Sequence, residues 1–180
     1  MKNYNYSKGV SLIEALFVLG IMAILIGMVM VLLSSASDRF KTNSLKEELM
    51  EIVHIASDLS KGRADYWGSI TAPDIINSGQ LGHQYYSNGL ITTPYGTVIN
   101  FATVNASSTT TNDIINLWVS GLSQADCISI ATTDFSNLSN AMNINYNVDS
   151  GGKAFNPQIA TQFCLKSGNN VIGWNFYRQE

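Results

Sequence analysis

One long uncharged stretch, entered by a single carboxylate, constrains this chain more than any other feature. Glu14 is followed by residues 15–37 without a charged side chain, and Ala15–Leu33 is almost wholly apolar. An apolar helix of about 20 residues spans the hydrocarbon core of a bilayer. A carboxylate left unpaired in apolar surroundings costs several kcal/mol, roughly. The sequence therefore predicts a membrane-length helix and a charged partner for Glu14.

The residues before Glu14 have the composition of a short basic leader. Residues 1–9 include Lys2 and Lys8, contain no acidic residue and end at Gly9. The glycine is followed by four residues, then Glu14, then the apolar stretch. This order predicts cleavage after Gly9 and assembly through the new amino terminus at Val10.

Two other interpretations of the amino terminus stay open. An ordinary signal peptide would be cut after Ala36, although its apolar region is usually only about 7–15 residues long. A simple signal anchor would be retained whole. Basic residues flank the stretch on both sides, so charge alone does not orient it in a membrane.

The segment Lys8–Glu14 (KGVSLIE) resembles the processing site of type IV prepilins, and Ala15–Ala23 is similar to their type IVb branch. Further along, Ser34–Lys41 and Leu117–Ala131 resemble the major subunit of the bundle-forming pilus. The stretch around Cys127 also resembles the toxin-coregulated pilus subunit.

This resemblance implies roles for three residues at the amino terminus. A prepilin peptidase of the inner membrane would cut after Gly9 and methylate the amine of Val10. Glu14 would pair with the positive Val10 amine of a neighbouring subunit during assembly. Two plainer roles for Glu14 remain: complementing the helix dipole, worth about 0.3–1 kcal/mol, or standing at the interface of a simple anchor.

The resemblance also implies a fibre. Subunits would wait in the inner membrane until an assembly platform and its ATPase draw them into a helical homo-oligomer, an extracellular pilus for adhesion or aggregation. Contacts with a host-cell surface or with other pili are left open. The alternatives are a minor pilin, a pseudopilin of type II secretion, or a membrane-anchored extracellular binding module that does not polymerise.

The expected fold class is α+β, a type IV pilin fold with a long helix on a mostly antiparallel sheet and a disulfide-bounded C-terminal region. One helix is expected over residues 10–61, and its part 10–37 is the transmembrane or fibre-core segment. The globular head is expected over residues 62–180. The second half of the helix carries apolar residues on one face: Leu45, Leu49, Ile52, Ala56 and Leu59.

Within the head, β-branched and aromatic residues predict four strands, the last of them central: Thr97–Val104, Ile114–Ser120, Met142–Val148 and Val171–Tyr177. A short helix is expected over Pro73–Ser78. Another should start at Ser123, where a capping-box pattern occurs. Residues 105–112 predict a loop.

Cys127 and Cys164 are the only cysteines. An even count in an exported chain predicts a disulfide, worth roughly 3–4 kcal/mol through its effect on the unfolded chain. Two buried free thiols are the alternative.

Charge argues against a nucleic-acid-binding role. Charged residues make up 13% of the chain, the net charge is −3, and no Lys or Arg occurs between Arg63 and Lys153. Such an acidic section repels phosphate backbones. It either meets basic edges of neighbouring subunits or is a solvated surface.

Enzyme chemistry finds no support in the sequence. The histidines are His54 and His83, and there is no CxxC, no HExxH and no glycine-rich phosphate loop after a strand. We therefore expect no catalytic residue, no cofactor and no metal site.

Overall fold

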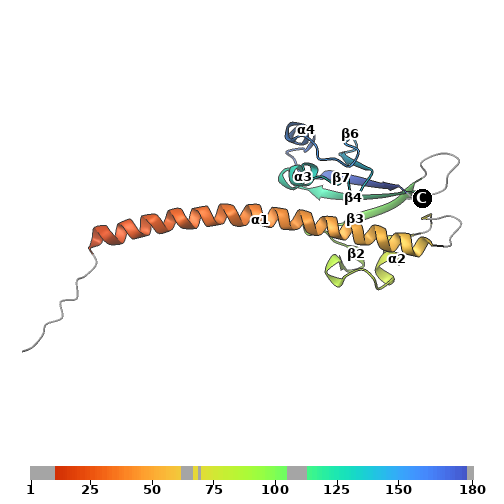
Figure 1. Ribbon diagram of the computed structural model, residues 1–180, viewed down its shortest axis with the longest axis horizontal. Helices are drawn as coiled ribbons and strands as arrows, with labels where there is room; N and C mark the ends of the chain where they lie inside the picture. The colour runs from red at the N-terminus through yellow and green to blue at the C-terminus, as the bar shows by residue number, and fades with distance from the viewer. Residues whose placement is uncertain (1–10, 62–66, 69, 105–112, 178–180) are drawn as a thin grey trace, which may run out of the picture. The chain divides into compact units, whose positions relative to one another are not determined.

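The computed structural model describes residues 11–61, 67–68, 70–104 and 113–177. The chain divides into two compact units, Met1–Arg39 and Phe40–Glu180. Helix α1, Leu12–Ser60, runs from the first unit into the second (Figure 1). The predicted long helix is thus confirmed over the described residues, while Val10 lies outside them.

The described residues of the first unit form the apolar part of α1. Its stretch Leu12–Met30 has a mean hydropathy of 2.6 over 19 residues, none of them buried. At 1.5 Å per residue this stretch is about 28 Å long, close to the thickness of a bilayer's hydrocarbon core. Length and composition therefore suit a membrane span.

The second unit contains an antiparallel sheet and short helices. In chain order its remaining elements are α2 (Ala72–Asn77), the 3₁₀ helix η1 (His83–Tyr85), β1 (Tyr86–Ser87), β2 (Leu90–Ile91), β3 (Ile99–Val104), β4 (Ile114–Leu122), α3 (Gln124–Ala131), β5 (Ala141–Ile144), β6 (Val148–Asp149), α4 (Pro157–Phe163) and β7 (Asn170–Tyr177). The five-stranded sheet has the order β3-β4-β7-β5-β6, and β1 pairs with β2 in a separate hairpin. Strand β7 lies between β4 and β5, so the predicted central strand is confirmed.

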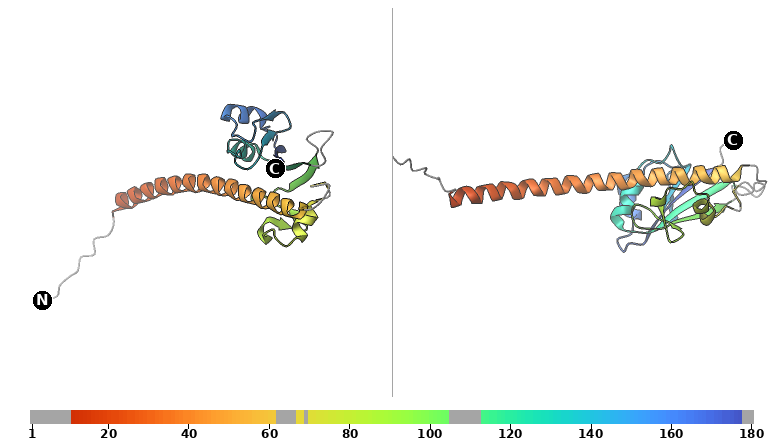
Figure 2. Two further views of the ribbon diagram at one scale, coloured as in Figure 1. Left: turned by 45° about the vertical axis from the view of Figure 1, so that its right-hand side comes forward. Right: turned by 90° about the horizontal axis from the view of Figure 1, so that it is seen from below.

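The core of this unit lies around the second half of α1. That half lies between the five-stranded sheet and the segment with α2 and β2 (Figures 1 and 2). Leu45, Leu49 and Ile52 have no exposed surface, and neither do Ile115 and Leu117 of β4. The helix repeat of 3.6 residues and the strand repeat of two bring these side chains to facing surfaces. The predicted buried face of the helix is confirmed, with Leu59 only partly buried.

One predicted strand is wrong in extent. Met142–Val148 was expected to be a single strand, but β5 ends at Ile144 and β6 turns back to pair with it. Asn145 and Tyr146 have φ angles of 50° and 60°, which a strand cannot contain. Asparagine tolerates this left-handed region, so the chain can reverse there.

The two predicted short helices are confirmed, but other short elements were not predicted. Helices α2 and α3 form where predicted, and Ser123 caps α3 by accepting a hydrogen bond from the Asp126 amide. Not predicted were α4, the 3₁₀ helix η1 and the β1–β2 hairpin, whose Asn88-Gly89 turn has φ angles of 52° and 76°. Asn-Gly is a strong hairpin signal. The predicted loop 105–112 lies outside the described residues.

Candidate assembly site

Glu14 lies in the first turn of α1. The helix begins there because the Ala15 amide donates to the Ser11 carbonyl at 3.0 Å. An acidic residue in this turn also interacts favourably with the positive end of the helix dipole. The predicted cleavage residues Gly9 and Val10 lie outside the described residues, so their roles stay predictions.

The surroundings of Glu14 are apolar and open. Leu12 and Ile13 are 79% and 75% exposed, and Leu16 and Phe17 are 61% and 72% exposed. A cluster of large exposed apolar side chains marks a surface that is covered by lipid or by another protein. Covering it would bury the Glu14 carboxylate too, and a buried carboxylate requires a donor or a cation.

The predicted disulfide between Cys127 and Cys164 is confirmed. Cys127 lies on α3 and Cys164 is the C-cap of α4, with their Cα atoms 5.9 Å apart and both side chains buried. The Gln124 side chain also donates to the Cys164 carbonyl at 3.0 Å. The bond therefore ties α4 to α3 beside the sheet.

Replacing Cys127 by serine should lower the amount of protein that accumulates. Removing this bond releases the loop between positions 127 and 164, at a cost of roughly 3–4 kcal/mol. Steady-state levels and thermal midpoints in detergent would measure the loss. The Cys127→Ser/Cys164→Ser double variant controls for mispairing of the remaining thiol. Wild-type levels in both variants would contradict a structural role.

Two amide side chains, the buried Asn170 and the half-buried Asn145, fix the chain after α4 and were not predicted from the sequence. Asn170 has no exposed surface, and its Oδ1 accepts from the Leu165 amide at 2.6 Å and from Asn145 Nδ2 at 3.1 Å. Its Nδ2 donates to the Leu165 and Leu122 carbonyls at 3.1 and 3.2 Å. Asn145 in turn donates to the Phe163 carbonyl at 2.7 Å. The turn at residues 165–168 is therefore held from inside.

A second buried polar residue was missed, Glu48 on α1. Its side chain has no exposed surface, and neither oxygen has a hydrogen-bond partner within the described residues. Burial raises the pKa of the Glu48 carboxyl to about 8, and the neighbouring Glu51 carboxylate acts in the same direction. The one sequence signal that Glu48 could be buried is its spacing, because Leu45, Glu48 and Ile52 fall on one helical face.

The two histidines are not brought together into a catalytic group. His54 Nδ1 lies 3.6 Å from Asp58 on the same exposed helix face, whereas His83 shares a 2.6 Å hydrogen bond with the Tyr86 hydroxyl. Among the described residues no group of His, Cys, Asp and Glu side chains could hold a metal ion.

Comparison with known proteins first gives the class of protein. Residues 4–30 match the family described as the prokaryotic N-terminal methylation motif. The crystal structure of a type IVb pilin from Salmonella typhi superposes with a TM-score of 0.56 at 20% identity, covering 74% of this chain and 97% of that one. The fold is therefore that of a type IV pilin, with the long helix, antiparallel sheet and C-terminal disulfide expected from the sequence.

Two relatives then narrow the resemblance. The major structural subunit of bundle-forming pilus from Escherichia coli O111:H- is 28% identical over 155 residues, covering 85% of this chain and 78% of the relative. Its counterpart from Escherichia coli O127:H6 (strain E2348/69 / EPEC) is 29% identical over 145 residues, covering 79% and 73%. The resemblance to type IVb pilins is confirmed.

Proposed function

We propose that this chain is a structural subunit of a type IV pilus. It is cleaved and N-methylated by a prepilin peptidase and polymerises into a surface fibre for adhesion or aggregation. The observation that carries the proposal is Glu14: within the matched methylation motif it is a lone carboxylate on an exposed apolar helix.

The proposed organisation follows from the chemistry of that helix. Residues 1–9 are the leader, 10–61 the helix with its membrane or fibre-core part at 10–37, and 62–180 the head. In the inner membrane the apolar part lies in lipid. In the fibre it lies among the same helices of other subunits. Its transfer from lipid to the fibre therefore exchanges one apolar environment for another. The carboxylate of Glu14 then pairs with the Val10 amine of a neighbour, which gives docking its register.

The proposed partners are the prepilin peptidase, an assembly platform with its ATPase, and further copies of this chain. The finished fibre is extracellular, and the subunit performs no catalysis. Relatives described as major structural subunits favour a major over a minor pilin. The alternatives remain a minor pilin, a pseudopilin and an anchored binding module that does not polymerise.

Shearing cells and fractionating the released material tests this function. Abundant polymer of this chain is expected on the surface. Traces within a polymer of another subunit would indicate a minor pilin. A complete absence from the sheared fraction, with the chain retained in membranes, would contradict a fibre subunit and support the anchored module.

The mature chain should begin at Val10 and carry one methyl group on its amine. Mass spectrometry of the N-terminal peptide from the membrane fraction measures both. A Gly9→Arg variant should retain the leader, since the residue before the cut would be too large for the peptidase. A mature chain beginning at Ser37 would instead identify an ordinary secreted protein.

A further inference from the structure

An apolar side chain is held out in water at the turn formed by residues 165–168. Leu165 is 52% exposed, and Lys166 beside it is exposed as well. The turn is closed by the Gly168 amide, which donates to the Leu165 carbonyl at 3.3 Å. We call these four residues the C-terminal turn.

The C-terminal turn is fixed from both sides. The Cys127–Cys164 disulfide precedes it directly. The buried Asn170 binds both the amide and the carbonyl of Leu165, at 2.6 and 3.1 Å. The backbone of Leu165 is thus held in place. The C-terminal turn therefore loses little conformational entropy when a partner covers the leucine.

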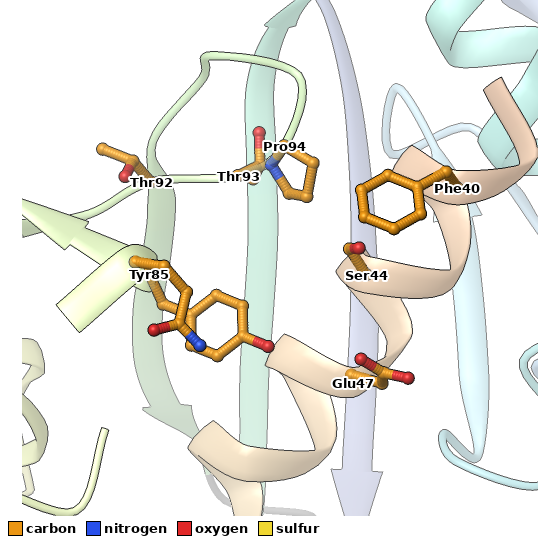
Figure 3. A pocket seen from close by; sticks show the side chains of 8 residues that line it. Phe40, Ser44, Glu47, Tyr85, Thr92, Thr93 and Pro94 are labelled. Atoms are coloured by element: carbon orange, nitrogen blue, oxygen red, sulfur yellow. The ribbon is translucent and has the colours of Figure 1, made fainter. Parts of the chain in front are cut away.

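A pocket of matching character lies elsewhere on the same unit, beside α1. Its volume is about 490 Å³, and we call it the α1 pocket (Figure 3). It is lined by Phe40, Ser44, Glu47, Gln84, Tyr85, Thr92, Thr93 and Pro94. Phe40, 72% exposed, points into the space between α1 and the segment that carries Pro94.

The walls of the α1 pocket are braced by hydrogen bonds. The Tyr95 and Thr42 hydroxyls lie 2.7 Å apart and join the segment after β2 to α1. On that segment the Thr93 and Thr97 hydroxyls lie 2.8 Å apart, and the Thr93 amide donates to the Thr97 carbonyl at 2.8 Å. A hollow that is already formed in the free subunit requires little rearrangement on binding.

The charges of the two surfaces are opposite. Glu47 supplies a carboxylate at the α1 pocket, and Lys166 supplies an ammonium group next to Leu165. Both side chains are exposed, and the ion pairs found between described side chains involve neither of them. An apolar side chain flanked by a cation therefore matches an apolar pocket flanked by an anion.

We propose that the C-terminal turn of one subunit inserts Leu165 into the α1 pocket of a second copy, with Lys166 pairing with Glu47. The inference rests on the proposed function, because it names a head contact of that fibre. The turn and the pocket are different surfaces of the chain, so the contact is heterologous. Repeated from copy to copy, such a contact does not close into a two-fold pair, and it generates an open helical array wherever its rotation does not close a ring.

Charge reversal tests the contact in the full chain. Glu47→Lys should lower sheared fibre about tenfold, because it would place two cations opposite each other. Lys166→Glu alone should lower it similarly. The Glu47→Lys/Lys166→Glu double variant should recover fibre to within about threefold of wild type, because the pair is restored with its signs exchanged.

The matched control uses another exposed lysine of the head. Lys153→Glu makes the same change of charge, and it should not rescue Glu47→Lys. Processed subunit in the membrane should stay at the wild-type level in every variant, which separates failed docking from failed folding. Equal rescue by both lysine variants, or no loss in Glu47→Lys, would overturn the proposed contact.

A photocrosslinking residue in place of Leu165, in an otherwise unchanged chain, gives a second, independent readout in assembled fibres. The expected product is a covalent dimer whose linked peptide contains residues of the α1 pocket, either 40–47 of α1 or 84–94. Crosslinks to any other segment, or none, would overturn the contact while leaving the fibre proposal intact. Absence of fibre from the wild-type chain itself would instead contradict the proposed function.

Discussion

Replacing Glu14 by glutamine should reduce surface fibre by more than tenfold while leaving the subunit inserted and cut after Gly9. The change removes the charge and keeps the size of the side chain. In the assembled core the Val10 amine of the neighbour would then be buried without a counter-charge. Breaking a buried ion pair in this way costs roughly 3–5 kcal/mol. Immunoblots of sheared and membrane fractions measure fibre and processed subunit together.

Three substitutions at this position separate the possible roles of the carboxylate. Glu14→Val should behave as Glu14→Gln does, although it makes the helix a better membrane span. Glu14→Asp keeps the charge on a shorter side chain and should retain part of the fibre yield. A simple anchor would tolerate all three equally. Normal fibre from Glu14→Gln would mean that the carboxylate does not direct docking, and the proposed assembly step would have to be abandoned.

Periodicity explains which parts of the fold could be predicted. The apolar stretch after Glu14 and the repeat from Leu45 to Ala56 are long enough to specify one helix, and α1 spans Leu12–Ser60. Strand β7 is dense in β-branched and aromatic residues, and it is the central strand. In these segments local preference and tertiary packing agree, so the sequence alone sufficed.

Short elements were missed because few residues specify them. Helix α4 has 7 residues, too few for a periodic pattern to be recognised. A signal was nevertheless present, since Asn156 caps the helix and Pro157 follows at its first position. Apolar and polar residues alternate without a break from Met142 to Val148, although the backbone reverses at Asn145. Turn chemistry, and not hydrophobic pattern, decided the outcome there.

The candidate sites divide in the same way. The disulfide followed from a count of cysteines and from the export signal. The burial of Asn170 and Glu48 could not be predicted from the sequence, because a single polar residue in an apolar face can point to solvent or to the core. Only the packed structure shows that both have no exposed surface. Asn170 has hydrogen-bond partners there, whereas the Glu48 carboxyl has none within the described residues.

The unpartnered Glu48 carboxyl should make the head less stable as the pH rises. Its pKa is about 8 in the folded chain against an ordinary value of 4.5. Between these values the folded state holds a proton that the unfolded state has released, so unfolding becomes easier with rising pH. The full penalty is present above pH 8, on the order of 4–5 kcal/mol. The thermal midpoint should fall by about 10 °C between pH 5 and pH 9.

Tryptophan fluorescence of the mature protein in a nonionic detergent can follow this transition, since Trp67, Trp118 and Trp174 all belong to the second unit. The pKa of Asp58 is lowered by its hydrogen bond from Lys61. The stability that this pair contributes is therefore lost only on acidification below the tested range.

Glu48→Gln removes the titrating group, so its thermal midpoint should change little between pH 5 and pH 9. Glu48→Leu should do the same and raise the midpoint at pH 9, because an apolar side chain replaces a buried charge. Glu47→Gln is the matched control, since it changes the exposed neighbour and should keep the wild-type slope. If the slope survived in Glu48→Gln but vanished in Glu47→Gln, the buried carboxyl would not be its source. The two variants make the same change of charge at adjacent positions of the same helix, one buried and one exposed. The comparison therefore separates the effect of burial from the effect of losing a charge.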